Sequence, residues 1–423
     1  MASNIDRARP VILPRLSFTR RVLRLPWLLL LGAAALVRLA AAQIVPAPPV
    51  PVLPPVVLAT PAEVVIGCAF PLTGEDAAVG QRALQGALVA AQVFDEVGPG
   101  IPLALAVRDT GGTPEGAARA VSELAGDEGA VAIVGPLTSV ESPAAAAAAQ
   151  SLRVPIITLT QHDGILSPGD FVFRALLTPR DQAEAIALYA ADAAARGRFA
   201  VIYPDDPFGR DLARAFSEGA ASRGAKVVRA SAYRGATDLA PAVDRALARR
   251  PGAAPGPSPW DGVFIPDTVA MARLVAAHLA SAGARGTRLL GMGLWNSPEA
   301  APLREMDGAL FSAPFTAGAQ RATARRLVEA YRRNFGGDPE GFAAQAHDAV
   351  ALLVDLLRSE PAANRERVRW KIQNTIAFEG AAGRLSFEGQ RDGKREAMIL
   401  TFRGGRIVPA DAYPVWKPPA GVR

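Results

Sequence analysis

Short runs of β-branched residues alternate with longer alanine-rich amphipathic stretches in this chain, beginning near Ala62. This alternation is typical of βαβ units, in which each helix returns the chain to the next parallel strand of a sheet. The pattern therefore predicts a doubly wound α/β unit in the first half of the chain. Its predicted strands are 64–70, 103–109, 130–135 and 155–159.

A second series of the same kind begins near Thr178 and predicts a second doubly wound unit. After Gly308 the order loosens into an apolar run over 309–313, three helices and a two-strand tail that turns at Gly404 and Gly405. Two α/β units in tandem are the simplest account of the pattern. The predicted strands of the second unit are 199–203, 226–232, 262–265 and 287–291.

The N-terminal segment differs from this pattern. A basic stretch leads into the apolar run 25–31 and an alanine-rich end at 40–42, an arrangement typical of a secretory signal peptide. An uncleaved anchor is the alternative, but the apolar run is shorter than the ~20 residues of a membrane span and Arg38 interrupts it. We therefore expect cleavage near Ala42, with removal of the signal peptide 1–42 and export to the periplasm.

The net charge of +6 resides in this predicted signal peptide. Residues 1–42 carry seven arginines and a single acid, so the remainder holds equal numbers of acidic and basic side chains. Nucleic-acid binding therefore loses its electrostatic support. We expect membrane contact only through the signal or through a partner.

Cys68 is the only cysteine, so no intramolecular disulfide and no cysteine-rich metal or redox site is available. The residues 65–68 match a lipoprotein processing site, but the stretch before them does not suit a signal helix. Residues 43–61 are rich in proline and predict an extended linker. We therefore expect Cys68 to be a buried strand residue.

Signatures of common enzyme classes are missing from the sequence. It has no Gly-x-x-x-x-Gly-Lys-Ser/Thr loop, no His-Glu-x-x-His motif and no Gly-x-Ser-x-Gly elbow. Of the three histidines, His278 lies in an apolar helical run and is expected in the core, whereas His162 follows a strand and is a candidate ligand contact. We expect a binding protein without cofactor or metal rather than an enzyme.

Open α/β sheets bind ligands outside the carboxyl ends of their strands, and small polar residues follow the predicted strands of the first unit. Thr73, Thr138 and Ser139 lie at these positions. Hydroxyls and backbone amides at helix starts can receive a carboxylate, although ordinary helix capping is the alternative explanation.

The second unit offers aromatic and acidic candidates at its strand ends. Phe208 and Trp295 can cover the apolar part of a ligand, with core packing as the alternative. Asp205, Asp206 and Asp267 can pair with a ligand ammonium, with helix capping as the alternative.

Five stretches, in order along the chain, resemble the leucine/isoleucine/valine-binding family of type I periplasmic binding proteins between about Val64 and Val408. They are Phe70–Gly74 with its Pro-Leu-Thr-Gly turn, Val134–Ser139 with 154–157, Tyr203–Arg210, Ala344–Val350 and Gly383–Phe387. The resemblance implies two doubly wound parallel-sheet lobes joined by a hinge of three crossovers. Lobe one would comprise 62–178 and 309–375, lobe two 179–308 and 376–412, and 413–423 a tail, with crossovers near Thr178, Gly308 and Ala377.

By position, the resemblance also implies ligand contacts in both lobes. In lobe one they are Thr138, Ser139, Glu141, Thr158, Thr160, Gln161 and His162, and in lobe two Phe208, Asp267, Thr268 and Trp295. Amino-acid-binding members hold the ligand ammonium with an acid near 294–296, where this chain has none. Glu141 and Gln161 are larger than the residues common at these positions, so we expect a narrower or shifted pocket.

The resulting hypothesis is a solute-binding protein that closes two lobes over a small amino-acid-like or amide-like ligand. It would present this ligand to an ABC permease and would be a monomer or a weak dimer. The alternative is a regulatory or scaffold protein of the same fold, such as an activator of a peptidoglycan synthase (penicillin-binding protein). The proline-rich linker and the missing acid favour this alternative.

Overall fold

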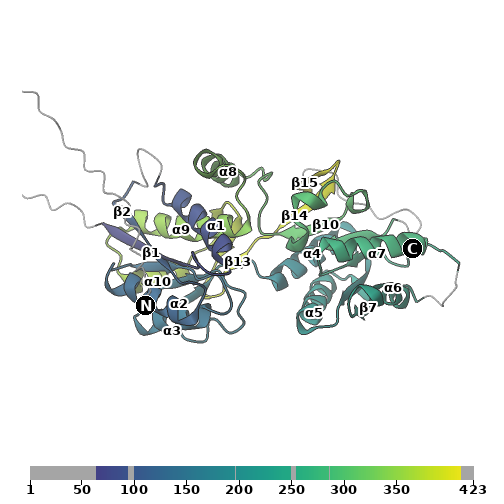
Figure 1. Cartoon of the computed structure of the whole chain (residues 1–423), viewed down its shortest axis with the longest axis horizontal. Helices are drawn as coiled ribbons and strands as arrows, with labels where there is room; N and C mark the ends of the chain where they lie inside the picture. Colours follow the sequence, from purple (N-terminus) through teal and green to yellow (C-terminus); the bar gives the residue numbers. More distant parts are fainter. Residues whose placement is uncertain (1–62, 94–99, 196, 249–253, 285, 411–423) are drawn as a thin grey trace, which may run out of the picture. The chain divides into compact units, whose positions relative to one another are not determined.

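The computed structural model describes residues 63–93, 100–195, 197–248, 254–284 and 286–410 (Figure 1). The predicted signal peptide over 1–42, the linker over 43–61 and the tail over 413–423 lie outside these described residues. Within them, no helix is long and apolar enough to cross a membrane.

The first lobe is built on a parallel sheet in the strand order β2-β1-β3-β4-β5. Helices α1 and α9 pack against each other on one face of this sheet, and α2 and α3 cover the other (Figure 1). The strands are β1 (Val64–Phe70), β2 (Leu103–Asp109), β3 (Ala132–Val134), β4 (Ile156–Thr158) and β5 (Val172–Arg174), and the helices are α1 (Ala77–Ala90), α2 (Pro114–Gly126), α3 (Ser142–Ser151) and α9 (Gly341–Ser359).

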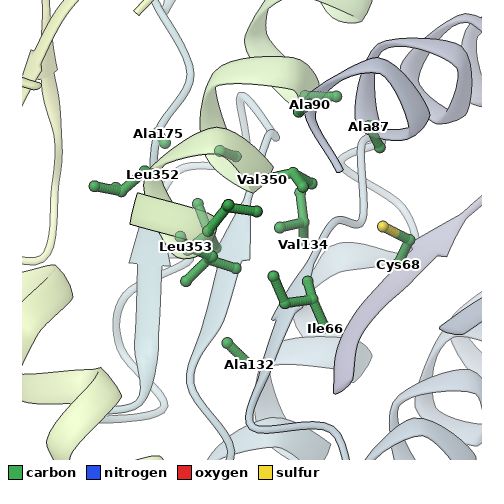
Figure 2. Packing of buried hydrophobic residues seen from close by; sticks show 14 of the residues in the cluster. Ile66, Cys68, Ala87, Ala90, Ala132, Val134, Ala175, Val350, Leu352 and Leu353 are labelled. Carbon is green, nitrogen blue, oxygen red and sulfur yellow. The ribbon is translucent and has the colours of Figure 1, made fainter. Parts of the chain in front are cut away.

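Both faces of β1 are buried because helices cover the two sides of the sheet. Side chains alternate between the faces of a strand, so Ile66 and Cys68 pack toward α1 and α9 while Ala69 packs toward α2 and α3. Figure 2 shows Ile66 and Cys68 beside Ala87 of α1 and Val350 of α9. The buried strand position predicted for Cys68 is confirmed, and burial raises the pKa of its thiol.

The second lobe is built on a sheet in the order β15-β14-β10-β9-β8-β6-β7. The strands β6 to β10 run parallel, and the hairpin of β14 and β15 adds antiparallel strands at one edge. The elements are β6 (Arg198–Pro204), β7 (Lys226–Tyr233), β8 (Gly262–Phe264), β9 (Arg288–Gly291), β10 (Leu310–Ala313), β14 (Met398–Arg403), β15 (Arg406–Pro409), α4 (Pro179–Ala193), α5 (Pro207–Ser222), α6 (Leu239–Leu247) and α7 (Val269–Ser281).

The remaining elements are short or lie outside the two large sheets. Four 3-10 turns, η1 (Ala236–Asp238), η2 (Gly293–Trp295), η3 (Pro298–Ala300) and η4 (Arg304–Met306), belong to the second lobe. The other elements are α8 (Ala322–Phe335), α10 (Arg365–Gln373) and a small antiparallel sheet of β11 (Phe378–Gly380), β12 (Gly383–Ser386) and β13 (Lys394–Arg395). The two helix-covered sheets confirm the predicted α/β class.

Two of the three expected crossover positions differ in the structure. The run 309–313 was expected in lobe one, but β10 pairs with β9 and β14 and so belongs to the second sheet. The segment 376–395 was expected in lobe two, but Leu385 of β12 is buried in the core of the first lobe. Strand pairing and packing with segments far away in the chain decide both assignments. The local sequence pattern cannot reveal these long-range contacts. At the first crossover, Thr178 caps the start of α4.

Candidate ligand-binding site

A carboxylate at the end of β2 holds the loop that follows β1. Asp109 accepts hydrogen bonds from the Leu72 N–H at 2.8 Å, the Thr73 hydroxyl at 2.6 Å and the Gly111 N–H at 2.8 Å. Partial burial opposes ionisation, but these hydrogen bonds together hold the pKa of Asp109 below its usual value. Thr73 is exposed at this edge, and its hydroxyl donates to Asp109.

A second carboxylate occupies the loop between β3 and α3. Glu141 is fully buried and accepts hydrogen bonds from the N–H groups of Leu137, at 3.2 Å, and Thr138, at 3.0 Å, as well as from the Thr110 hydroxyl. The Thr138 hydroxyl in turn accepts from the Glu141 N–H at 3.4 Å. Ser139 is exposed on the same loop. Thr138 and Glu141 therefore bond to each other, whereas Ser139 faces solvent.

The segment after β4 contains both buried and accessible candidates. The Thr158 hydroxyl donates to the Phe173 carbonyl at 2.8 Å, and the Thr160 hydroxyl accepts from the His162 N–H at 3.2 Å. Both threonines are fully buried, so the prediction that they touch a ligand is not supported: their hydroxyls fasten β4 to β5 and shape the loop. The Nδ1 atom of His162 is buried without a hydrogen-bond partner among the described residues, and Gln161 is exposed.

A cavity of about 160 Å³ lies beside Gln161, where the chain passes from β5 to α4. Three glutamine side chains contribute polar groups to a lining that is otherwise mainly apolar. The lining residues are Gln161, Leu176, Leu177, Pro179, Gln182, Pro314, Glu340, Gly341, Phe342 and Gln345. Gln182 and Gln345 were not predicted from the sequence.

In the second lobe, two acids follow β6. Asp206 caps α5 by accepting the Gly209 N–H at 2.6 Å, and Asp205 forms ion pairs with Arg210 and Arg234, each at 2.7 Å. Phe208 lies in the first turn of α5 with 48% of its surface exposed. Phe208 is thus accessible to a ligand, whereas the charge of Asp205 is already neutralised.

Asp267 follows β8 and accepts hydrogen bonds from the Tyr233 hydroxyl and from the Thr268 N–H. Burial, together with the hydrogen bond to Asp267, raises the pKa of the Tyr233 hydroxyl, which therefore stays protonated. Thr268 caps α7 and is exposed. In the described part of the chain, Asp267 forms no ion pair with a cationic side chain.

Trp295 does not cover a ligand as predicted. Its ring is fully buried and packs against Phe311, and its indole N–H donates to the Asp267 carbonyl at 2.8 Å. Gly291 provides the space for this ring, because a Cβ there would lie 2.3 Å from it. The alternative explanation of core packing is therefore the correct one for Trp295.

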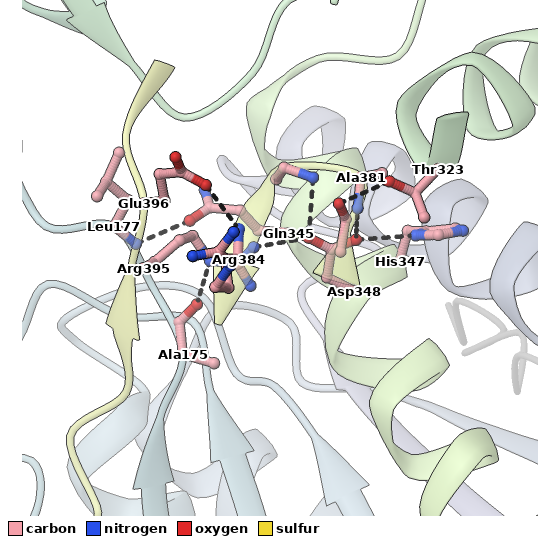
Figure 3. Close-up of polar contacts among 12 residues, drawn as sticks. Ala175, Leu177, Thr323, Gln345, His347, Asp348, Ala381, Arg384, Arg395 and Glu396 are labelled. Atoms are coloured by element: carbon pink, nitrogen blue, oxygen red, sulfur yellow. Dashed lines mark hydrogen bonds and ion pairs between the residues drawn. The ribbon is translucent and has the colours of Figure 1, made fainter. Parts of the chain in front are cut away.

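A buried polar network that the sequence did not reveal holds the crossover segments (Figure 3). Arg395 of β13 forms a fully buried ion pair with Asp348 of α9 at 2.6 Å and donates to the Ala175 carbonyl at 3.2 Å. Gln345 accepts the Leu177 N–H at 2.8 Å. The first and third crossovers are thus fastened to the same helix, α9.

Asp348 also collects backbone donors. It accepts the N–H groups of Ala381, at 2.6 Å, and Ala382, at 2.9 Å. Burial alone would raise its pKa, but the hydrogen bond with His347 and the charge of Arg395 hold the pKa of Asp348 below its usual value. The family resemblance predicts a helix over 344–350, which contains Asp348. Nothing in the sequence marks Arg395 as buried.

The second lobe has its own link to the first crossover through Gln182 of α4. The side-chain oxygen of Gln182 accepts a hydrogen bond from the Gly293 N–H at 2.9 Å. The main-chain carbonyl of Gln182 accepts one from the Ser312 hydroxyl at 2.7 Å. These bonds join α4 to η2 and β10. Among the described residues, no group of three His, Cys, Asp or Glu side chains is arranged to hold a metal ion.

Comparison with solved structures supports the fold. A Rhodospirillum rubrum protein assigned to branched-chain amino acid ABC transport aligns with a TM-score of 0.72 at 22% identity, over 82% of this chain and 99% of that one. A Desulfitobacterium hafniense ABC transporter substrate-binding protein in complex with Leu aligns with a TM-score of 0.63 at 24% identity, over 82% and 99%.

A third structure carries a different ligand. The solute-binding protein of an ABC transporter from Rhodopseudomonas palustris BisB5, in complex with 3,4-dihydroxy benzoic acid, aligns with a TM-score of 0.59 at 18% identity, over 80% of this chain and 93% of that one. A comparison with curated proteins finds no match. The family model for periplasmic binding proteins matches residues 63–403, a span that includes the first sheet and every strand of the second sheet except the edge strand β15. The resemblance predicted from five short stretches is thereby confirmed, and the chain belongs to the periplasmic binding protein family.

Proposed function

We propose that this protein is an exported solute-binding subunit that captures a small polar ligand by hinge closure and delivers it to an ABC permease. The observation that carries the proposal is the convergence of accessible polar and aromatic groups at the carboxyl ends of both sheets. Ser139, Gln161 and His162 lie on this edge of the first sheet, and Phe208 and Asp267 on that of the second. Binding at these edges is the general behaviour of open α/β sheets.

The crossover network supports hinge closure rather than a rigid junction. Hinge motion needs a few connecting residues that change conformation between bodies that stay packed. Here Gln345 and Arg395 hold the first and third connections to α9 by a small number of directional bonds. Each lobe keeps its own apolar core. A ligand that binds both lobes would then shift the population toward the closed form.

The ligand is proposed to be amino-acid-like or amide-like. The similar proteins include complexes with leucine and with an aromatic acid, so the fold accommodates quite different small molecules. In this chain the Asp267 carboxylate, which forms no ion pair among the described residues, can receive a ligand ammonium or amide N–H group, and Phe208 can cover the apolar part of the ligand.

Thermal unfolding in the presence of a metabolite library tests the proposal, because a ligand bound only by the native state raises Tm. The library should contain amino acids, their amides, amines and aromatic acids. We expect at least one class to raise Tm, calorimetric titration to give a Kd, and small-angle scattering to show compaction with that ligand. The absence of both binding and compaction across the library would contradict the proposal.

The sequence supports a second candidate, a regulatory protein of the same fold that acts on cell-wall synthases. The proline-rich stretch over 43–61 suits a tether, and 294–296 lacks the acid expected of an amino-acid site. Affinity capture from cell envelopes separates the candidates. Recovery of a permease supports transport, and recovery of a peptidoglycan synthase with no ligand-induced compaction supports the regulatory role.

A further inference from the structure

The loop between β3 and α3 contains its own carboxylate at the place where a ligand anion would bind. In general, backbone N–H groups at a strand end and at the following helix start are the natural receptors of a carboxylate. Here the N–H groups of Leu137 and Thr138 and the Thr110 hydroxyl all donate to Glu141, whose side chain is fully buried. An incoming anion would find these donors already taken.

From this we infer that the first lobe excludes a ligand carboxylate and receives instead a neutral or positively charged group of the ligand. The inference rests on the proposed function and names the ligand class that the same site accepts. Glu141 is then the residue that determines this specificity, because it satisfies the loop donors and leaves a negative charge behind them.

The neighbouring loops reinforce this effect. Strands β2, β1 and β3 are adjacent in the sheet, and Asp109 takes the donors of the loop after β1 just as Glu141 does after β3. Thr110 joins the two sites, since it follows Asp109 in the chain and donates to Glu141. The loops 71–76, 109–113 and 135–141 contain four acids and no lysine or arginine.

The charges of these two carboxylates are not cancelled locally. Every hydrogen bond to Asp109 and Glu141 described above comes from a hydroxyl or a backbone N–H group, and neither carboxylate forms an ion pair within the described residues. Like charges repel strongly where solvent is partly excluded. A ligand carboxylate would meet both occupied donors and this repulsion, whereas an amide or an amine would meet acceptors.

The other polar groups at the same edge are compatible with a neutral or cationic group of the ligand. The Nδ1 atom of His162 is buried and lacks a protein partner among the described residues, and Ser139 is exposed. Each can donate or accept a hydrogen bond without carrying a fixed positive charge. Arg174 ends β5 at this edge but is paired with Asp392, and the loops 71–76, 109–113 and 135–141 contain no lysine or arginine that could replace the cation a carboxylate would need.

The first test is rescue of Glu141→Ala by formate. The substitution leaves the donors of Leu137, Thr138 and Thr110 unsatisfied, so Tm should fall, and formate should raise it by several degrees more than chloride at equal ionic strength. The wild type and Glu115→Ala should show no such difference, because Glu115 is an exposed first-turn acid of α2. A Glu141→Ala protein that responds alike to formate and chloride would overturn the inference.

The second test compares ligands in pairs, such as leucine with leucinamide and benzoate with benzamide. The wild type should bind the neutral or cationic member of a pair at least about tenfold more tightly, and Glu141→Gln should reduce this preference by about as much. Glu141→Gln keeps the shape of the side chain, so it serves even where Glu141→Ala does not fold. A wild type that prefers the acids would refute the inference. If the wild type binds neither member of any pair and no library compound, the proposed function fails, and the formate rescue still decides whether Glu141 fills the anion position.

Discussion

Individual buried carboxylates organise the first lobe at the residue scale. Asp348 of α9 binds two backbone N–H groups near β11 and β12 and pairs with Arg395 of β13. A buried backbone donor without a partner is costly, so each of these bonds fastens a segment that few other contacts hold. Asp348 thereby attaches the third crossover to the lobe against which α9 packs.

Replacing Asp348 by Asn should lower the free energy of unfolding by about 3 kcal/mol at neutral pH, because it leaves the buried Arg395 without a counter-charge. The control is Asp355→Ala on the exposed face of α9, which should change stability by less than about 0.5 kcal/mol. Denaturant titration of the two variants makes the comparison. Equal stabilities would show that the ion pair adds nothing.

The stability difference between the wild type and Asp348→Asn should depend on pH. The folded-state pKa of Asp348 lies below the unfolded value of about 3.9, so its stabilisation is present above that pH and is lost as pH falls through the folded pKa. The gap between wild type and Asp348→Asn should therefore narrow in acid. A gap that stays constant from neutral pH to pH ~2 would show that ionisation of Asp348 is not involved.

At the element scale, close contact between helices depends on glycines, which have no side chain to hold the backbones apart. Helices α1 and α9 meet where Gly86 faces the backbone of Ala343, and a Cβ on Gly86 would lie 1.9 Å from the Ala343 carbonyl oxygen. Gly80 approaches the Pro71 carbonyl in the same way and holds α1 against the loop after β1. The small residues of α1 therefore set its distance from both neighbours.

Gly86→Ala should push α9 away from α1 and destabilise the protein by about 1–3 kcal/mol, the usual range for overpacking. Gly126→Ala is the matched control, because Gly126 ends α2 and a Cβ there meets no atom within 4 Å. That substitution should be neutral or stabilising by up to ~1 kcal/mol. Thermal and denaturant unfolding of both variants would decide, and a tolerated Gly86→Ala would contradict the contact.

At the scale of the whole molecule, two helix-covered sheets present accessible groups at their carboxyl edges, and the crossovers join them. Of the two aromatic candidates, Phe208 is exposed and available to a ligand, whereas Trp295 is enclosed in the core of the second lobe. Ligand capture and stability should therefore respond differently to these two positions.

Phe208→Ala should weaken ligand binding by at least about fivefold, since truncating an aromatic contact commonly costs more than ~1 kcal/mol. It should leave the unfolding free energy of the ligand-free protein within about 0.5 kcal/mol of wild type. Leu274→Ala, at an exposed position along α7, is the control and should alter neither quantity. Calorimetric titration measures the first effect, and an unchanged Kd for Phe208→Ala would remove this residue from the site.

The sequence alone determined the class of the fold and the edge at which polar groups collect. Strand and helix periods are local properties, so the alternation of β-branched and alanine-rich runs predicted both series of βαβ units, and the residues after each strand followed directly. The strands β5, β11 and β13, of two or three residues each, were not predicted, because runs this short carry little periodic signal.

Tertiary structure alone decided which sheet takes each late segment and which candidates face solvent. The run 309–313 joins the second sheet through pairing with β9 and β14, and 376–395 packs on the first lobe through Asp348 and Arg395. Thr158 and Trp295 are buried, and Gln182 and Gln345 form hydrogen bonds at the crossovers that the sequence did not predict. Local pattern records whether a residue suits a strand or a helix. Partners far away in the chain decide whether it is buried, and with what.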